Sequence, residues 1–228
     1  MIKYIREDEP IPGKQPKALA EFKDVNRYWD RLNQCYAAKI IPGEYYVSKE
    51  GELVTTVLGS CVSACVWDVK VKLGGMNHFM LPDAGSNNEW GSWNKTPVDA
   101  AARYGSVAME RLINTILKYG GRKENLEIKI FGGGRVLNID SDVGERNIEF
   151  VENYAKKEGF TIKSRDVGGS HPRKVNFYPG DGRVYVKKLL RMHNPTVQLR
   201  ERAYFREIYD QPVTGDVDVF VEKKPGVN

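Results

Sequence analysis

Cys61 and His78 are the two residues whose types and spacing best suit nucleophilic chemistry in this sequence of 228 residues. They stand on two β-prone segments that flank a polar turn. If this hairpin closes with Trp67 opposite Lys72, Cys61 falls opposite His78, and directly opposite residues share a face with Cβ atoms ~4.5–5.5 Å apart. A thiol and an imidazole at that separation form a nucleophile and its base.

Thr55 is the candidate for the third member of this group. In an extended chain Thr55 and Cys61 point to the same face of the strand. We therefore expect Thr55 to reach His78 and to orient its ring, as the third member of a catalytic triad does. Gly59-Ser60 suits a sharp turn that exposes the sulfur, and the backbone N–H groups of that turn would form an oxyanion hole.

The competing interpretation is structural, because a free cysteine in a β-strand is often a small core residue. We read Cys65, which lies within the apolar strand, in this way. The odd, small number of cysteines predicts a reducing, cytoplasmic location and no disulfide scaffold. Three cysteines and three histidines also leave little material for a zinc site, so we expect no metal.

The elements that must position these residues follow from hydrophobic periodicity and from glycine and proline breaks. Predicted helices cover about 16–34, 97–119, 142–158 and 195–209, and predicted strands cover 45–48, 53–57, 62–67, 73–81, 126–131, 160–166, 174–178 and 182–188. Helices do not alternate regularly with strands, and hairpins are frequent, which is typical of an α+β fold. Gly132-Gly133-Gly134 lacks the spacing of a phosphate-binding loop, so we expect these glycines to supply positive φ or to permit close approach of backbones.

The net charge of +5 comes entirely from residues 187–206, which carry six basic residues and one acid, Glu201. Such a segment either forms a solvated helix face or meets an anionic partner. In the predicted C-terminal helix, Leu199, Ala203 and Phe205 lie on one side and arginines on the other, and packing on the domain is the simpler expectation. No apolar run is long enough for a transmembrane helix, and the N-terminus lacks the apolar core of a secretory signal.

Several motifs resemble one known family. Leu58-Gly59-Ser60-Cys61-Val62, followed by Gly75-Met76-Asn77-His78 and Met80-Leu81-Pro82, is similar to the CheD family of chemoreceptor glutamine deamidases. Pro42-Gly43-Glu44-Tyr45, Lys129-Ile130-Phe131-Gly132-Gly133 and Gly144-Glu145-Arg146-Asn147 agree with it in order. The resemblance covers about residues 40–190.

The resemblance implies a reaction and a site. Selected glutamine side chains of methyl-accepting chemotaxis receptors would be hydrolysed to glutamate with release of ammonia, and some family members are thought to hydrolyse glutamate methyl esters as well. The family's nucleophile falls on Cys61, its histidine on His78 and its threonine on Thr55, with Thr56 as an alternative. No cofactor or metal is implied. A phosphatase of the CheC type is a candidate partner, and a monomer is the simplest expectation.

The resemblance also implies a β-sandwich-like core with helices packed against it, similar to the catalytic domains of deamidating toxins. We expect an N-terminal extension with a helix at 1–40, the deamidase domain at 41–190, and a basic helix and tail at 191–228. Two other functions compete with the enzyme. One is a regulatory module that binds the receptor or the CheC-type partner without turnover. The other, ranked last because no recognised motif is present, is a nucleic-acid binder that uses residues 187–206.

Overall fold

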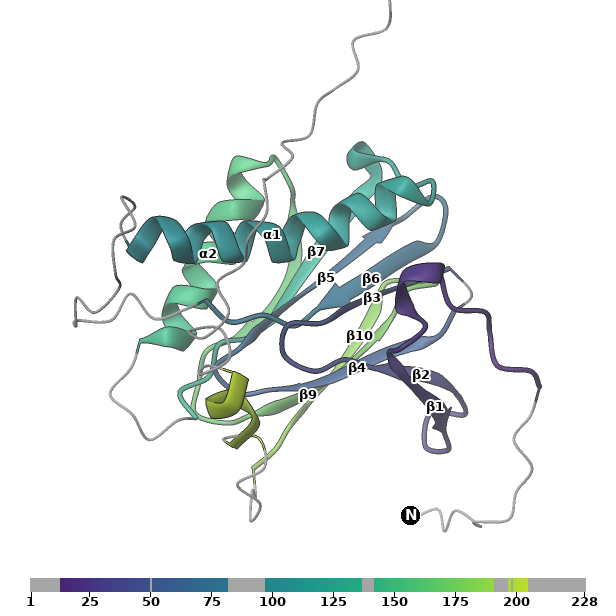
Figure 1. Cartoon of the computed structure of the whole chain (residues 1–228), viewed down its shortest axis with the longest axis horizontal. Helices are drawn as coiled ribbons and strands as arrows, with labels where there is room; N and C mark the ends of the chain where they lie inside the picture. Colours follow the sequence, from purple (N-terminus) through teal and green to yellow (C-terminus); the bar gives the residue numbers. More distant parts are fainter. Residues whose placement is uncertain are drawn as a thin grey trace, which may run out of the picture.

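The protein is described by a computed structural model, which covers residues 13–49, 51–81, 97–136, 142–190, 197 and 199–204. Two mixed sheets of five strands form the core, and two long helices lie on one of the sheets (Figure 1). The α+β, sandwich-like architecture predicted from the sequence is thus confirmed. None of the described helices is long and apolar enough to span a membrane.

The first sheet has the strand order β1-β2-β4-β9-β10, and only the β2–β4 pair is parallel. Its strands are β1 (Asn26–Asp30), β2 (Cys35–Lys39), β4 (Leu53–Leu58), β9 (Arg173–Tyr178) and β10 (Arg183–Lys188). Burial alternates along β9, as expected for a strand with one face on the core. In the same sheet, β4 is buried along almost its whole length.

The second sheet has the order β3-β6-β5-β7-β8, with only β7–β8 parallel. Its strands are β3 (Tyr45–Ser48), β6 (Leu73–Asn77), β5 (Val62–Asp68), β7 (Leu126–Gly132) and β8 (Ile162–Val167). Helices α1 (Pro97–Lys118) and α2 (Val143–Lys157) cover this sheet (Figure 1). The central strand β5 is buried along almost its whole length because it is covered on both faces.

The helix predicted over 16–34 is wrong. The structure has only a short 3-10 turn there, η1 (Ala20–Phe22), followed by the β1–β2 hairpin. Asp30 explains the difference, because its carboxylate accepts hydrogen bonds from the backbone N–H groups of Leu32 and Asn33, and such local bonds compete with a helix. Since β2 pairs with β4, this segment belongs to the first sheet.

The hairpin that carries the candidate site is formed by β5 and β6, but its register differs from the prediction by two residues. Trp67 pairs with Gly74, where the sequence had suggested Lys72. Asp68 lengthens the turn by accepting hydrogen bonds from the N–H groups of Lys70 and Val71. A shift of two residues keeps every side chain on its predicted face, whereas a shift of one would have reversed them.

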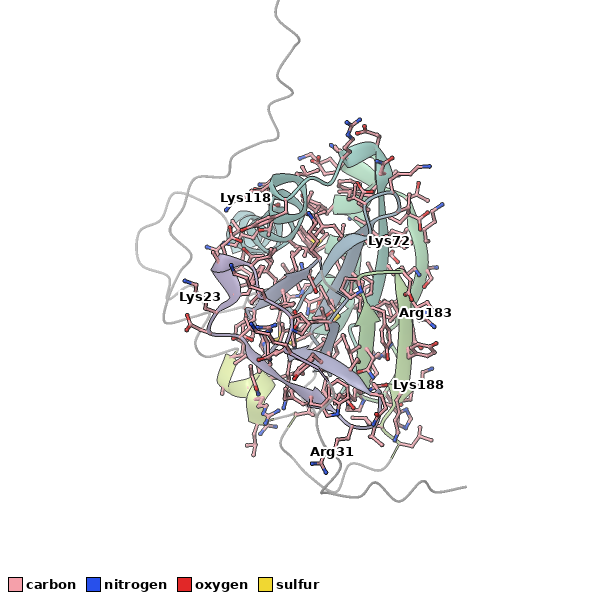
Figure 2. All side chains as sticks on the ribbon, turned by 90° about the vertical axis from the view of Figure 1, so that its right-hand side faces the viewer. Lys23, Arg31, Lys72, Lys118, Arg183 and Lys188 are labelled. Atoms are coloured by element: carbon pink, nitrogen blue, oxygen red, sulfur yellow. The ribbon has the colours of Figure 1, made fainter. Side chains whose placement is uncertain are left out.

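The basic stretch is divided between two elements. Its first part lies on β10, an edge strand, and Figure 2 shows Arg183 and Lys188 pointing outward there, which discourages pairing with another strand. Its later part includes the helical residues 199–204, as predicted. The predicted apolar face of that helix is wrong for Leu199 and Ala203, which are exposed, while Glu201 is buried. Phe205, its third predicted member, lies outside the described residues.

Candidate active site

The residues around Cys61 form a loop that carries the chain from one sheet to the other. The loop leaves β4 of the first sheet after Leu58 and enters β5 of the second sheet at Val62. Three donors hold its carbonyl groups: Gly134 N binds Gly59 O at 2.7 Å, Asn147 Nδ2 binds Ser60 O at 2.9 Å, and Gly133 N binds Cys61 O at 2.8 Å. The predicted role of the glycine run, close approach of backbones, is therefore confirmed.

The N–H groups of the same loop converge on one point. A trans peptide directs its N–H opposite to its C=O, so fixing the Gly59 and Ser60 carbonyls fixes the direction of the Ser60 and Cys61 N–H groups. The backbone N–H groups of Gly59, Ser60 and Cys61 donate to the Glu201 carboxylate at 2.8, 2.9 and 3.3 Å, and the Ser60 hydroxyl donates to it at 2.7 Å. Successive N–H groups arranged in this way form an anion-binding concavity. This arrangement suits a carboxylate or an oxyanion.

His78 lies directly after β6, and the adjoining loop fixes its backbone. Its N–H donates to Glu44 O at 2.9 Å, and its carbonyl accepts from Gly43 N at 2.8 Å. The bridge between Val62 and Phe79 continues the hairpin past it. His78 is only 2% exposed, so its ring is enclosed by the protein.

The hydrogen bonds of Thr56 determine the tautomer of His78. The Thr56 hydroxyl lies 2.8 Å from Ile40 O and 2.8 Å from His78 Nδ1. A hydroxyl has one proton to donate, and the Ile40 carbonyl can only accept it. Thr56 therefore accepts from Nδ1–H, and the lone pair of the neutral ring lies on Nε2. His78 Nε2 has no hydrogen-bond partner among the described residues, so it is available to a substrate or to the thiol.

The thiol, the imidazole and the carboxylate form one group. Cys61 Sγ, a ring nitrogen of His78 and a carboxylate oxygen of Glu201 lie within 4.8 Å of one another, and all three residues are buried. Within the described part of the chain they are also the one trio of this kind that could hold a metal ion. Glu201 already receives four hydrogen bonds from N–H and O–H donors, which is the environment of a bound anion.

Burial keeps both reactive groups neutral, and the nearby carboxylate strengthens this effect on the thiol. Desolvation, followed by the charge of Glu201 and a hydrogen bond with it, raises the pKa of Cys61 well above its usual value. Desolvation lowers the pKa of His78 to about 3. At neutral pH the site therefore holds a thiol and a neutral imidazole while Glu201 is in place.

The structure places Thr55 away from His78, so the predicted contact between them is wrong. Thr55 Oγ1 donates to Asn176 Oδ1 of β9 at 2.7 Å, within the first sheet. The prediction assumed one continuous strand from Thr55 to Cys61, whereas the loop changes sheets between them. Of the two threonines that the sequence left open, Thr56 is the one that contacts the imidazole.

Replacing the two threonines separately tests this distinction. Thr56→Val should lower kcat for the glutamine hydrolysis that the family resemblance implies by about 10- to 100-fold, because it leaves the buried Nδ1–H without its acceptor. Thr56→Ser, which keeps the hydroxyl, should restore most of the rate, and Thr55→Val should have a much smaller effect. Steady-state kinetics on a receptor fragment would decide; equal losses in the two valine variants would contradict the assignment.

Sequence reasoning missed two residues of the site. Asn147 holds the Ser60 carbonyl and also accepts from Leu81 N at 2.8 Å. Asn147 is fully buried. The only sign of its importance in the sequence was its place in the motif Gly144-Glu145-Arg146-Asn147. Glu201, which binds the N–H groups of the Cys61 loop, is the second missed residue. The sequence marked it only as the single acid in the basic stretch 187–206. Cys65 is buried opposite Met76 and away from this group, as a structural thiol should be.

A thiol beside an imidazole with a free nitrogen, next to a concavity of backbone N–H groups, is the arrangement of thiol-dependent acyl-transfer enzymes. The family model described as CheD chemotactic sensory transduction matches residues 80–188. A probable chemoreceptor glutamine deamidase CheD of Halorhodospira halophila is 53% identical over 205 residues, covering 90% of this chain and 94% of the relative. A protein of the same description from Hahella chejuensis is 47% identical over 209 residues, covering 92% of this chain and 97% of the relative. Another from Herminiimonas arsenicoxydans is 49% identical over 198 residues, covering 86% of this chain and 95% of the relative. The chain belongs to the CheD family.

Proposed function

We propose that this protein hydrolyses glutamine side-chain amides of methyl-accepting chemotaxis receptors to glutamate, and so acts in chemotactic adaptation. The description of its relatives as probable chemoreceptor glutamine deamidases supports this substrate. The observation that carries the proposal is the convergence of Cys61, His78 and the N–H groups of residues 59–61 on one point. A glutamine Cδ at that point would meet a nucleophile, a proton carrier and an oxyanion hole together.

In each half-reaction of the proposed mechanism, His78 first accepts a proton and then returns one. His78 Nε2 takes the thiol proton as Cys61 Sγ attacks the glutamine Cδ, and the N–H groups of the loop hold the developing oxyanion. His78 then protonates the leaving nitrogen, and ammonia departs from a thioester. A water molecule that gives its proton to His78 hydrolyses the thioester, which releases glutamate and restores the thiol. Thr56 acts as a positioning residue for His78 throughout.

The same thioester would form from a glutamate methyl ester, with methanol leaving in place of ammonia. The site thus supports ester hydrolysis as a second reaction on the same receptors. A CheC-type phosphatase as a partner and a monomeric state remain proposals that rest on the family resemblance.

The test is conversion of a purified receptor cytoplasmic fragment. Wild-type protein should release ammonia and add about one dalton at particular glutamines, located by tandem mass spectrometry, because an amide is exchanged for an acid. Cys61→Ala should bind the fragment without converting it. If the wild type binds the receptor and converts nothing, the regulatory function replaces the enzymatic one.

A further inference from the structure

Glu201 occupies the position in the site where the product of the proposed reaction would lie. We propose that residues 199–204 form a built-in product mimic: the Glu201 side chain fills the subsite for the substrate carboxamide, and a receptor glutamine must displace it to be hydrolysed. This inference rests on the proposed function and identifies the side-chain subsite and its resting occupant. Figure 1 shows this short helix, in yellow-green, at one end of the two sheets.

The chemistry of the contact matches a product complex. Deamidation of glutamine leaves a carboxylate on a two-carbon stem, which is the side chain of glutamate. Glu201 Oε1 accepts from Gly59 N and Cys61 N, and Oε2 accepts from Ser60 N and the Ser60 hydroxyl. Glu201 is 1% exposed, and a carboxylate so buried needs these donors. The donors that hold it are the ones that the proposed mechanism assigns to the oxyanion.

Gly59 makes room for the side chain that enters this subsite. A Cβ at position 59 would lie 2.6 Å from Glu201 Oε2 and 2.5 Å from Val136 Cγ2. Both distances are shorter than the contacts that Cβ atoms make in proteins. The backbone conformation does not demand glycine here, since no left-handed φ is found at this position. The absence of a side chain at position 59 is therefore required by the occupant of the pocket and its wall.

The docked segment is anchored through few side chains, as a displaceable ligand should be. Besides Glu201, Tyr204 is buried; its hydroxyl hydrogen-bonds that of Tyr104, and its ring lies against Gly43. Leu199 is 58% exposed, and Arg200, Arg202 and Ala203 are exposed as well. Among the described residues of this helix, Glu201 is the one whose side chain lies beside Cys61 and His78, and it is an acid.

Occupation of the subsite by Glu201 also favours the protonated, unreactive form of the Cys61 thiol. The negative charge of Glu201 and its hydrogen bond to the thiol are two of the causes that raise the pKa of Cys61. A neutral glutamine side chain in the same place would lack that charge. Displacement of Glu201 by substrate would thus remove an obstacle to thiolate formation.

The direct test converts the mimic into a substrate. In Glu201→Gln, Cys61 should attack the amide at position 201, and ammonia should leave after His78 protonates its nitrogen. Water should then hydrolyse the resulting thioester to glutamate. The purified variant should therefore carry glutamate at position 201, about one dalton above the encoded mass. In Cys61→Ala/Glu201→Gln the glutamine should persist. The exposed Gln34 in the same protein is the internal control and should stay unchanged.

A second measurement tests displacement. Glu201→Ala should raise kcat/KM for the receptor fragment by about tenfold, because the competent, open site becomes more populated. Arg202→Ala, an exposed neighbour on the same helix, should leave the rate unchanged.

The outcomes separate this inference from the proposed function. If the glutamine at position 201 persists in an enzyme preparation that converts the receptor, the proposed role of Glu201 as a product mimic is wrong, while the proposed deamidase function is supported. Conversion in trans, by wild-type protein added to Cys61→Ala/Glu201→Gln, as fast as in the single variant would also overturn it. An unchanged or lower kcat/KM in Glu201→Ala would overturn displacement. If no preparation converts either glutamine, the proposed function itself fails.

Discussion

Alanine at Cys61, alanine at His78 and the double replacement are expected to reduce kcat/KM for receptor deamidation by the same factor, at least about 10⁴-fold. The two side chains act as a unit in the proposed mechanism. Without the thiol there is no nucleophile for the imidazole to activate. Without the imidazole the thiol keeps its proton, since burial raises its pKa. Removing the second residue therefore costs nothing more.

The neutral state of His78 makes this prediction sharper. Burial lowers its pKa to about 3, and Thr56 fixes the proton on Nδ1. The lone pair of Nε2 is thus free at neutral pH before the substrate arrives, and the resting site holds no thiolate–imidazolium pair. His78→Gln, which offers no comparable base, should behave as His78→Ala does.

The measurement is single-turnover deamidation by mass spectrometry, with urea unfolding of each variant as the control for folding. Losses that add, so that the double variant is slower than either single variant by the product of their factors, would show that the residues act independently. A His78→Ala variant with nearly normal kcat would remove His78 from the mechanism. In both cases the observed site would need another base.

Gly132→Ala is the second replacement expected to have a large effect, and Gly120→Ala is its matched control. Both glycines have a left-handed backbone, with φ of 111° and 107°, so both variants bear a similar strain of about 1 kcal/mol. They differ in their surroundings. A Cβ at position 132 would lie 2.2 Å from Cys61 O, whereas nothing lies within 4 Å of one at position 120.

The collision at position 132 is with backbone, which cannot rotate aside. The Cys61 carbonyl must move, and the N–H groups that share its loop must move with it. We expect Gly132→Ala to lower the free energy of unfolding by about 2–4 kcal/mol and kcat/KM by at least about 100-fold. Gly120→Ala should lose only stability. Urea unfolding and deamidation kinetics on both variants would check this, and a Gly132→Ala enzyme with normal kcat/KM would show that the loop tolerates the shift.

Much of the fold was predictable because local rules decide it. The strands near 45–48, 53–57 and 174–178 and the helices at Pro97–Lys118 and Val143–Lys157 agree with the periodicity of their residues. The N-terminal helix failed where an equally local competitor, the carboxylate of Asp30, captured two backbone N–H groups. Apolar spacing at three and four residues predicts a helix only when no side chain offers the backbone a better partner.

The sequence by itself determined the nucleophile and its base, because residue chemistry and a hairpin suffice to bring Cys61 and His78 together. Even an error of two residues in register left them on one face, since side chains alternate with a period of two. Strand parity favoured Thr55 over Thr56 as the partner of His78, and this prediction was wrong. The chain passes from one sheet to the other after β4, and strand parity does not carry across such a crossing.

Only the tertiary structure decided what else surrounds the sulfur. Glu201 lies 140 positions from Cys61 in the chain, and no periodicity links residues so far apart. Its helix buries this acid and leaves Leu199 and Ala203 exposed, although the apolar pattern had assigned those two residues to the core. The acid can be buried because four hydrogen bonds compensate its carboxylate for leaving water. Such compensation depends on where the donors of a distant loop point. The contacts of Gly134 and Asn147 with the Gly59 and Ser60 carbonyls fix the direction of the Ser60 and Cys61 N–H groups.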